Sequence, residues 1–303
     1  MSKTRLREHL LAFMTIFIWG LTFLSTTSLG SHLSSLEILF ARYLIAYVVL
    51  WALYPKPFFF QGWKKEGFLF AAALSGAAVY QYLENLSVSY TSPASVSFIA
   101  ATAPIFTALL AHRFLGEKVT AKTIIGMLVS LLGVFFICFG DSKTVETGIT
   151  GDLIILGSIW LWAVYSVLVK KIAKFGFHQL QQTRRLFLYS LLCMLPFMLF
   201  RKTPCPLSAF FAKESLFHLI FLGVFASAIC FAGWNQSVEK LGATTTSKYL
   251  FIMPLITLVG QALYNQNAVG KEALLGMAVT LLGIGISEFS LRRKEIQKKT
   301  KEL

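Results

Sequence analysis

Two apolar stretches of the chain carry hydroxyl and aromatic side chains at helical spacing. These residues are Thr15, Trp19, Thr22 and Thr26 in the first stretch, and Ser158, Trp162 and Tyr165 in a later one. Intervals of three and four residues place each group on one face of a helix. A face of this kind avoids lipid and turns toward a cavity or toward another helix. If it lines a cavity, the candidate substrate-binding residues are Trp19, Thr22, Trp162 and Tyr165; packing between helices is the alternative.

A carboxylate lies near the end of the third apolar stretch. Tyr80 and Glu84 share one helix face, while Gln81 and Asn85 share another. A carboxylate costs about 2.5–3.5 kcal/mol at the centre of a bilayer and less toward its surface. Glu84 therefore either reaches water at the membrane edge or faces a cavity between helices. In a cavity, Tyr80, Glu84 and Asn85 would contact substrate, and Glu84 would bind an amine or carry a proton.

Three basic residues also fall within apolar stretches. Arg42 and Arg185 occupy corresponding positions in the two halves of the chain, and both can extend to a membrane surface. Lys248 corresponds to Phe98 of the first half, so it breaks the similarity between the halves. A lysine in a pocket would suit a carboxylate or a phosphate on the substrate. The alternative is that Lys248 also extends to the cytoplasmic surface.

Pro104 and Pro254 lie in the middle of apolar stretches. Each proline removes one backbone hydrogen bond and kinks its helix. Such backbone is tolerated within a membrane where neighbours, water or a ligand can satisfy the freed carbonyl. We therefore expect a hinge or a bend at a cavity, with a purely structural kink as the alternative.

Two glycines that are seven residues apart lie near the end of each half. They are Gly126 and Gly133 in the first half, and Gly276 and Gly283 in the second. Small residues allow the backbones of two helices to approach closely. They predict a seam of close helix packing that braces each half.

Residues for covalent or metal chemistry form no recognisable set. Neither an HExxH nor a GxSxG pattern occurs, and there is no Walker motif for ATP. The histidines lie in loops or near helix ends, and the four cysteines form no CxxC pair. We therefore expect no catalytic residues, no metal site, no cofactor and no enzyme activity. A receptor or purely structural role remains an alternative.

The composition of the chain indicates whether water or lipid surrounds it. Of the 303 residues, 56% are hydrophobic and only 14% are charged, and the mean hydropathy is +0.67. A soluble domain would need a polar surface that this sequence lacks. The net charge of +14 would suggest nucleic acid in a soluble protein. Here the basic residues lie between apolar runs and at the chain ends, so we expect a lipid bilayer and no nucleic acid as partner.

Ten apolar segments are each about long enough to cross the hydrocarbon core of a bilayer. They are 9–28, 36–54, 67–86, 92–111, 121–139, 152–170, 185–200, 216–236, 244–264 and 272–290. Because they are continuously apolar rather than alternating, they predict helices. The expected fold class is an all-α membrane protein with ten transmembrane helices.

The lysines and arginines outside these segments predict the orientation. With a cytoplasmic N-terminus, 20 lie on the cytoplasmic side, counting Lys122 and Lys170 at the very ends of their segments, and 5 lie on the other side. This asymmetry predicts that both termini are cytoplasmic. The first apolar run lacks a clear cleavage site, so we interpret it as an uncleaved first helix. The expected location is the cell inner (plasma) membrane.

The two halves of the chain resemble each other. Residues 126–133 match residues 276–283 at six of eight positions, and the same shift of 150 pairs Asn85 with Asn235 and Pro104 with Pro254. Asn235 therefore joins the candidate substrate-binding residues. The predicted units are 1–142, 143–290 and a basic cytoplasmic tail at 291–303. Five helices per unit make the second copy inverted, with a substrate site near the midplane.

The chain resembles the drug/metabolite transporter superfamily, of the EamA-like type. The residues that carry the resemblance are Trp19-Gly20, Phe23, Arg42, Pro104, Leu115-Gly116-Glu117-Lys118, Gly126 and Gly133. It implies a ten-helix transporter that exports or exchanges small metabolites, often amino acids. Two positions depart from the family: its early proline in the second helix is replaced around Leu36-Glu37, and Asn267 stands where a glutamate is common.

The predicted function is a secondary transporter that moves an amino acid or related metabolite, in the direction of export, by alternating access. A coupling proton or a counter-substrate is a possible partner, and the sequence indicates no oligomeric state. The alternative within transport is an anion or organophosphate exchanger that would use Lys248 with Arg42 or Arg185.

Overall fold

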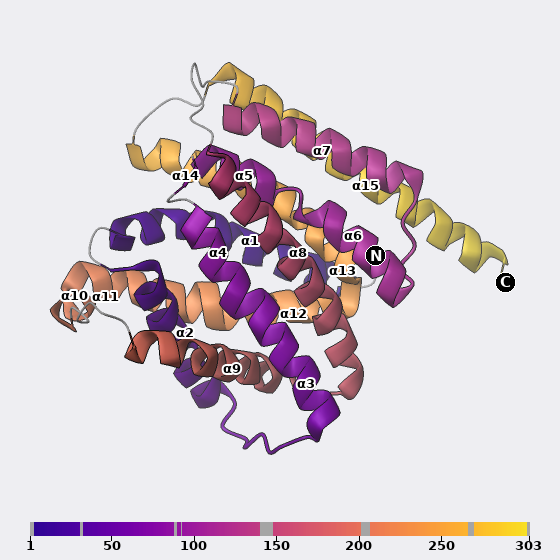
Figure 1. Cartoon of the computed structure of the whole chain (residues 1–303). Coiled ribbons are helices and arrows are strands. Elements are labelled where there is room, and N and C mark those ends of the chain that lie inside the picture. The colour runs from indigo at the N-terminus through magenta and orange to yellow at the C-terminus, as the bar shows by residue number, and fades with distance from the viewer. Residues whose placement is uncertain are drawn as a thin grey trace.

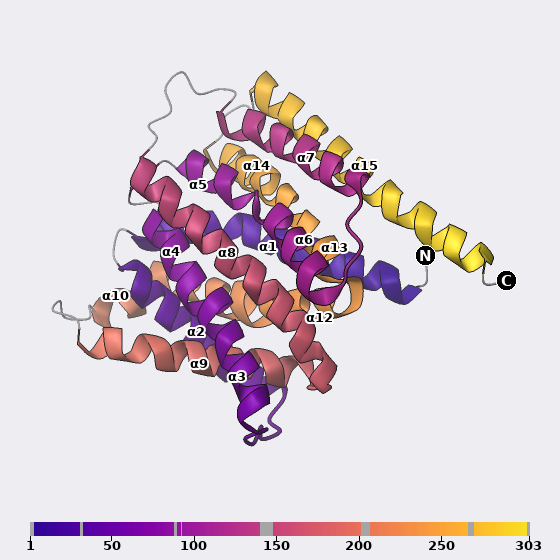
Figure 2. The ribbon, with the colours of Figure 1, turned by 45° about the vertical axis from the view of Figure 1, so that its right-hand side comes forward.

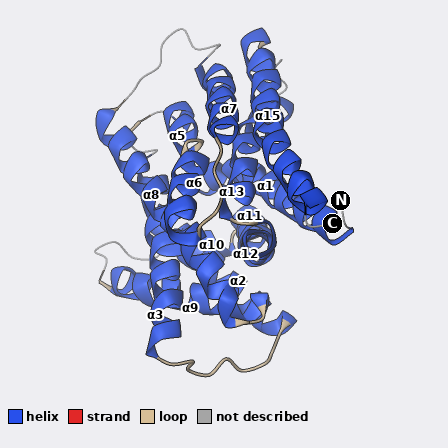
Figure 3. Cartoon of the chain, turned by 90° about the vertical axis from the view of Figure 1, so that its right-hand side faces the viewer, coloured by secondary structure: helices blue, strands red, loops and turns tan. Residues whose placement is uncertain are grey.

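A computed structural model of the chain describes residues 3–30, 33–87, 90–91, 93–139, 148–200, 207–265 and 270–301. Asn267 lies outside these ranges, as does the predicted boundary between residues 142 and 143. The side chains of Phe23 and of residues 288–301 are also outside the described part. Every regular element in the described ranges is helical (Figure 3). The expectation of an all-α chain is therefore confirmed.

The elements follow in an order that Figure 1 displays by colour. They are α1 (Lys3–Gly30), α2 (Ser35–Leu53), α3 (Trp63–Ala72), η1 (Ala73–Val79), α4 (Tyr80–Ser87), α5 (Pro93–Ala100), α6 (Ala103–Leu115), α7 (Ala121–Phe139), α8 (Ile149–Ile172), η2 (Ala173–Phe175), α9 (Gln179–Leu199), α10 (Leu207–Phe211), α11 (Lys213–Ile220), η3 (Phe221–Ile229), α12 (Cys230–Leu241), α13 (Ala243–Ser247), η4 (Lys248–Ile252), α14 (Met253–Asn265) and α15 (Lys271–Lys301). Several of them adjoin directly, so that α3, η1 and α4 form one continuous helical segment, as do α11, η3 and α12.

Five helical segments of the described ranges are long and apolar enough to cross a bilayer. They are Ser35–Leu53, Ser95–Leu115, Ala121–Phe139, Ile149–Phe175 and Lys213–Leu241. Large apolar side chains such as Leu132 and Leu282 remain exposed on the outer faces of the helices. Both observations accord with a helical membrane protein, whose exterior contacts lipid rather than water.

Helix α2 begins at a complete capping box. The backbone N–H of Glu37 donates to Ser34 Oγ at 3.4 Å, and the backbone N–H of Ser34 donates to Glu37 Oε2 at 2.7 Å. These bonds satisfy two donors that a helix start leaves free. The resemblance implied a proline early in this helix, and the capping box provides a defined helix start without one.

Two π-helical turns, η1 and η3, interrupt otherwise α-helical segments. Each includes a glycine at a close approach. A Cβ atom added to Gly76 in η1 would lie 2.7 Å from the Cβ of Tyr165, and one added to Gly223 in η3 would lie 2.6 Å from the Cβ of Ile45. Glycine is thus required at both turns because no side chain fits. π-turns of this kind are often found at functional sites.

Both mid-span prolines lie at interruptions of the α-helix. Pro104 is in the first turn of α6, after a turn at Ala101 and Thr102 that ends α5. Pro254 follows the 3-10 turn η4 and lies in the first turn of α14. A proline at the start of a helix needs no hydrogen-bond partner for its nitrogen. The expected breaks in regular helix are therefore present; their use as hinges stays a prediction.

The glycine seam does not brace each half separately. Instead α7 packs against α15, and the two helices lie side by side along one edge of the molecule (Figures 1 and 2). Ser130 Oγ donates to the carbonyl of Thr280 at 3.2 Å, and Thr280 Oγ1 donates to the carbonyl of Ser130 at 3.4 Å. The spacing of small residues predicts close packing, but it does not identify the partner helix.

Glu117, in the loop after α6, caps a distant helix. Its Oε1 accepts from the backbone N–H of Ala243 at 2.8 Å, and its Oε2 accepts from that of Thr244 at 2.9 Å. A carboxylate at a helix N-terminus satisfies free N–H groups and interacts favourably with the helix dipole. Glu117 thereby joins the end of α6 to the start of α13.

We expect Glu117→Ala to lower the free energy of unfolding by about 1–2 kcal/mol, since two N–H groups lose a charged acceptor. Thermal unfolding of the purified protein in detergent measures this change. Lys118→Ala is the matched control, because Lys118 is an exposed neighbour and such substitutions usually stay within about 0.5 kcal/mol. Equal melting temperatures for the two variants would contradict the capping role.

Candidate functional site

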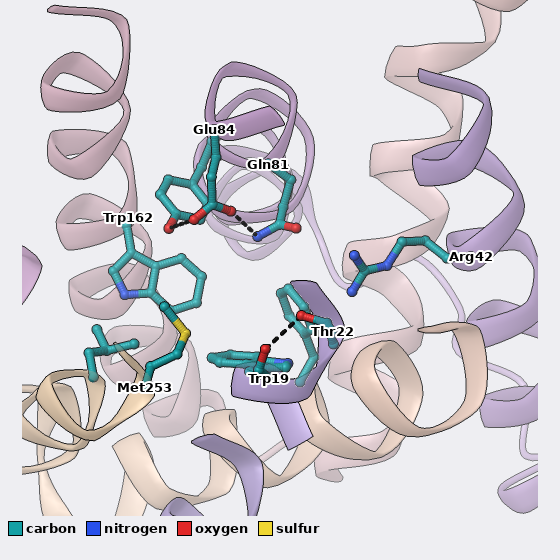
Figure 4. Close-up of a pocket in the computed structure, with 10 residues that line it drawn as sticks. Trp19, Thr22, Arg42, Gln81, Glu84, Trp162 and Met253 are labelled. Carbon is teal, nitrogen blue, oxygen red and sulfur yellow. Dashed lines mark hydrogen bonds between the residues drawn. The ribbon is translucent and has the colours of Figure 1, made fainter. Parts of the chain in front are cut away.

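A cavity lies among the helices, next to buried aromatic residues (Figure 4). The empty space in and above it is about 480 Å³, a figure that includes open solvent. The residues that line it come from α1, α2, α4, α8, α12, η4 and α14: Trp19, Thr22, Arg42, Tyr80, Gln81, Glu84, Trp162, Phe231, Leu250 and Met253. Five of the predicted substrate-binding residues are among them, namely Trp19, Thr22, Tyr80, Glu84 and Trp162.

Aromatic rings form one wall of the cavity. The ring centres of Trp19 and Trp162 are 5.7 Å apart in an edge-to-face arrangement, and those of Tyr80 and Trp162 are 4.9 Å apart. The ring centre of Phe231 lies 5.4 Å from that of Trp19. Trp19 Nε1 also donates to the carbonyl of Ala226 in η3 at 2.8 Å. These contacts hold the rings in fixed orientations, because edge-to-face pairs and buried hydrogen bonds restrict rotation.

The acidic side of the cavity is formed by α4. Tyr80 Oη donates to Glu84 Oε1 at 2.9 Å, which the spacing of four residues allows, and Gln81 Nε2 donates to Glu84 Oε2 at 3.4 Å. Both oxygens of the carboxylate are therefore positioned by neighbours on the same helix. Each oxygen can accept a further hydrogen bond from a ligand.

The basic side of the cavity is formed by Arg42 on α2. This residue is only 7% exposed, and its Nε donates to Ser227 Oγ of η3 at 2.9 Å. Figure 4 shows Arg42 and Glu84 on different sides of the cavity. Arg42 therefore faces the cavity, in contrast to the interpretation that it extends to the membrane surface. Its planar fork of donors suits a carboxylate.

The indole ring of Trp162 presents its six-membered ring to the cavity, while its nitrogen lies on the far side (Figure 4). Trp162 Nε1 is buried and has no hydrogen-bond partner among the residues that the structure describes. The cavity thus combines a cation, an anion and aromatic surface. Within the described part, no cluster of three or more His, Cys, Asp or Glu residues could hold a metal ion.

The other four predicted residues lie outside the cavity lining. Tyr165 Oη donates to Asn235 Oδ1 at 2.6 Å, and Asn235 Nδ2 donates to Thr183 Oγ1 at 3.1 Å, so these buried side chains connect α8, α12 and α9. Asn85 is half-buried on α4. Lys248 is 2% exposed, and its Nζ donates to the carbonyl of Ser287 on α15 at 3.4 Å.

Sequence reasoning missed several lining residues. Phe231, Leu250 and Met253 are apolar residues within apolar stretches, so no feature of type or spacing distinguishes them. Gln81 could have been found, because it lies three residues from Glu84 and can donate to it. Arg42 was considered as a cavity residue only in the exchanger alternative. Its charge within an apolar stretch is the sequence signal that favours the cavity.

Comparisons with known proteins give one consistent result. The model of the EamA-like transporter family matches residues 6–139 and 149–288. An uncharacterized transporter of Archaeoglobus fulgidus is 25% identical, over 93% of this chain and 98% of its own length. A probable terminal-alkyne amino-acid exporter of Streptantibioticus cattleyicolor is 26% identical, over 69% of each chain. A solved crystal structure at 18% identity has the same fold, with a TM-score of 0.77 over 93% of this chain and 98% of that one.

Proposed function

Because this chain belongs to the EamA-like transporter family, a group of membrane transporters within the drug/metabolite transporter superfamily and not of enzymes, we propose that it is a secondary carrier of a small metabolite. The observation that carries this proposal is the cavity with Arg42 on one side and Glu84 on another. Alternating access would expose this cavity first to one membrane surface and then to the other.

The proposed architecture is ten transmembrane helices in two inverted units, 1–142 and 143–290. The two stretches matched by the family model support it, since each lies within one unit. The π-turns support it too, because a shift of 150 places η1 on η3. Packing is also reciprocal: α2 packs against η3 as α9 packs against η1, and α6 packs against α8 as α14 packs against α1.

The proposed orientation has both chain ends at the cytoplasmic surface of the inner membrane. The excess of lysine and arginine in the loops on that side supports this orientation. The start of α1 and the end of α15 lie on the same side of the molecule (Figures 1 and 2), as this topology requires. Residues 291–303 would then form the basic cytoplasmic tail.

The proposed substrate is an amino acid or a related compound, moved in the direction of export. Arg42 would bind the carboxylate and Glu84 the amino group, while Trp19 and Trp162 would contact the side chain. Opposite charges on the two sides of one cavity match a zwitterion. The similarity to a probable amino-acid exporter supports the same choice.

The alternative exchanger of anions or organophosphates gains less support. Lys248 points to α15, and Arg185 Nη2 lies 3.3 Å from Glu66 Oε1, so neither lines the cavity with Arg42. Of these three cations, only Arg42 lines the cavity, and the carboxylate of Glu84 lines the same cavity. A doubly charged phosphate would be repelled by that carboxylate.

Counterflow in proteoliposomes tests the proposed function. Vesicles with the full chain, loaded with unlabelled amino acids, should accumulate labelled amino acid from outside without ATP. Vesicles loaded with sugar phosphates should not exchange that label. Counterflow of sugar phosphates but not of amino acids would contradict the proposal.

Glu84→Gln should weaken competition by amino acids about tenfold or more, since the amino group loses its charged partner. Competition by the matching carboxylic acids without an amino group should remain. The pH dependence of transport should also flatten, because glutamine cannot titrate. Glu214→Gln is the control, since Glu214 is exposed and outside the cavity. Normal transport by Glu84→Gln over the full pH range would remove Glu84 from the site.

A further inference from the structure

A second cavity lies where α2 and α9 meet the segment 54–60. The empty space in and above it is about 380 Å³, a figure that includes open solvent. Its lining residues are Tyr47, Trp51, Pro57, Phe58, Arg184, Arg185 and Leu188. None of these residues lines the central cavity, so the proposed transport function does not account for them.

Both arginines of this cavity are held in place. Arg184 is 5% exposed; its Nη1 donates to the carbonyl of Tyr54 at 2.8 Å and its Nη2 to that of Lys56 at 2.6 Å. The guanidinium carbon of Arg185 lies 4.7 Å from the ring centre of Phe58. The two cations are therefore fixed at the cavity by the backbone and by an aromatic ring, instead of moving freely in solvent.

The charge of this cluster is not balanced within the described part of the chain. Glu66 forms an ion pair with Arg185 at 3.3 Å, but it also accepts from the N–H of Gln61 at 3.1 Å and from Tyr189 Oη. Glu66 is thus paired with Arg185, and no ion pair joins Arg184 to a carboxylate of the described residues. In addition, Arg185 Nε is buried and has no hydrogen-bond partner among the described residues. An anion at the cavity would compensate this charge.

The surroundings of the cavity resemble a membrane interface. Trp51 is 53% exposed, and the apolar side chains of Val48 and Leu192 are exposed further along α2 and α9. Tryptophan is enriched where headgroups meet acyl chains. Lys56 and Lys64 lie in and just after the adjoining loop, on the side with the basic loops. The cations thus lie at the polar end of an apolar, lipid-facing surface.

We propose that this cavity binds the phosphate group of an anionic phospholipid, with the acyl chains lying along α2 and α9. Basic pockets between helices at the cytoplasmic surface suit such headgroups. The proposal uses the membrane placement above, but it is independent of the substrate in the central cavity. A soluble phosphate ester offers the same charged group without the chains, so it distinguishes the headgroup from the whole lipid.

The test uses the full chain, purified in a neutral detergent, and measures its melting temperature. Added phosphatidylglycerol should raise this temperature by several degrees, because a ligand stabilises the state that it binds. Phosphatidylcholine, which has no net charge, and glycerol 3-phosphate, which has no chains, should have much smaller effects. Equal stabilisation by phosphatidylcholine would overturn the proposal, and so would stabilisation by glycerol 3-phosphate alone.

Two variants locate the effect. Arg184→Gln removes a charge, and Leu188→Trp fills the cavity without changing the charge. In each variant, about tenfold more phosphatidylglycerol, or still more, should be needed for the same rise in melting temperature. Lys64→Gln is the control, because Lys64 is exposed and outside the lining. If Arg184→Gln disturbs the segment 54–60, Leu188→Trp still tests the site. An unchanged response in Leu188→Trp, or an equal loss in Lys64→Gln, would refute the proposal.

Discussion

Gly133→Leu should lower the free energy of unfolding by about 3 kcal/mol or more, enough to deplete the folded protein. A Cβ atom at Gly133 would lie 2.6 Å from the carbonyl oxygen of Gly276 on α15. That oxygen belongs to the backbone and cannot turn away as a flexible side chain would. The two helices would have to separate along the whole seam, and both hydrogen bonds between Ser130 and Thr280 would be lost.

The yield of monodisperse protein and its melting temperature measure this effect. Gly157→Leu is a matched control, because Gly157 is also in a long helix and a Cβ atom there would meet nothing within 4 Å. It should leave both quantities close to those of the unmodified chain. Gly133→Leu protein that melts at the same temperature as Gly157→Leu would show that the close contact between α7 and α15 is absent.

Arg42→Gln should reduce the rate of amino-acid counterflow about 30-fold or more. Removing one partner of a buried, charge-assisted contact costs about 2–5 kcal/mol, and 1.4 kcal/mol corresponds to tenfold. Arg42→Lys should retain part of the activity, since it keeps the charge but loses the planar fork that binds both carboxylate oxygens. Ser227, which accepts a bond from Arg42, stays in place in both variants.

The specificity of the loss distinguishes binding from folding. In Arg42→Gln, amino acids should no longer compete better than the matching amines without a carboxylate. Arg113→Gln is the control, because Arg113 is exposed at the end of α6. Unchanged counterflow in Arg42→Gln would exclude this arginine from the substrate site, whereas a loss with unaltered preference for carboxylates would indicate a structural role.

Local periodicity accounts for much of what could be predicted from sequence. The helices follow from continuous apolar stretches, and the two separate faces that carry Trp19 and Trp162 each follow from intervals of three and four residues. The hydrogen bond from Tyr80 to Glu84 also follows from such an interval. In these cases the relevant neighbours belong to one helix, so the spacing of residues determines which side chains meet.

Positions that depend on contacts between distant helices could not be predicted in the same way. Lys248 has the chemistry of an anion-binding residue, yet it bonds to Ser287 because η4 packs against α15. Likewise, Tyr165 and Asn235 bond to each other between α8 and α12 rather than to the cavity. Polar character within an apolar stretch indicates a buried partner, but that partner can be a ligand or another helix.

The contact between α7 and α15 limits how the molecule can change shape. Gly133 and Gly276 meet through backbone atoms, and so do Gly126 and Gly283 further along the pair. Sliding one helix past the other would drive Cα hydrogens into carbonyl oxygens within a fraction of a residue. The two helices should therefore move as one rigid body. The movements that open the molecule to solute from either side must then come from the remaining helices.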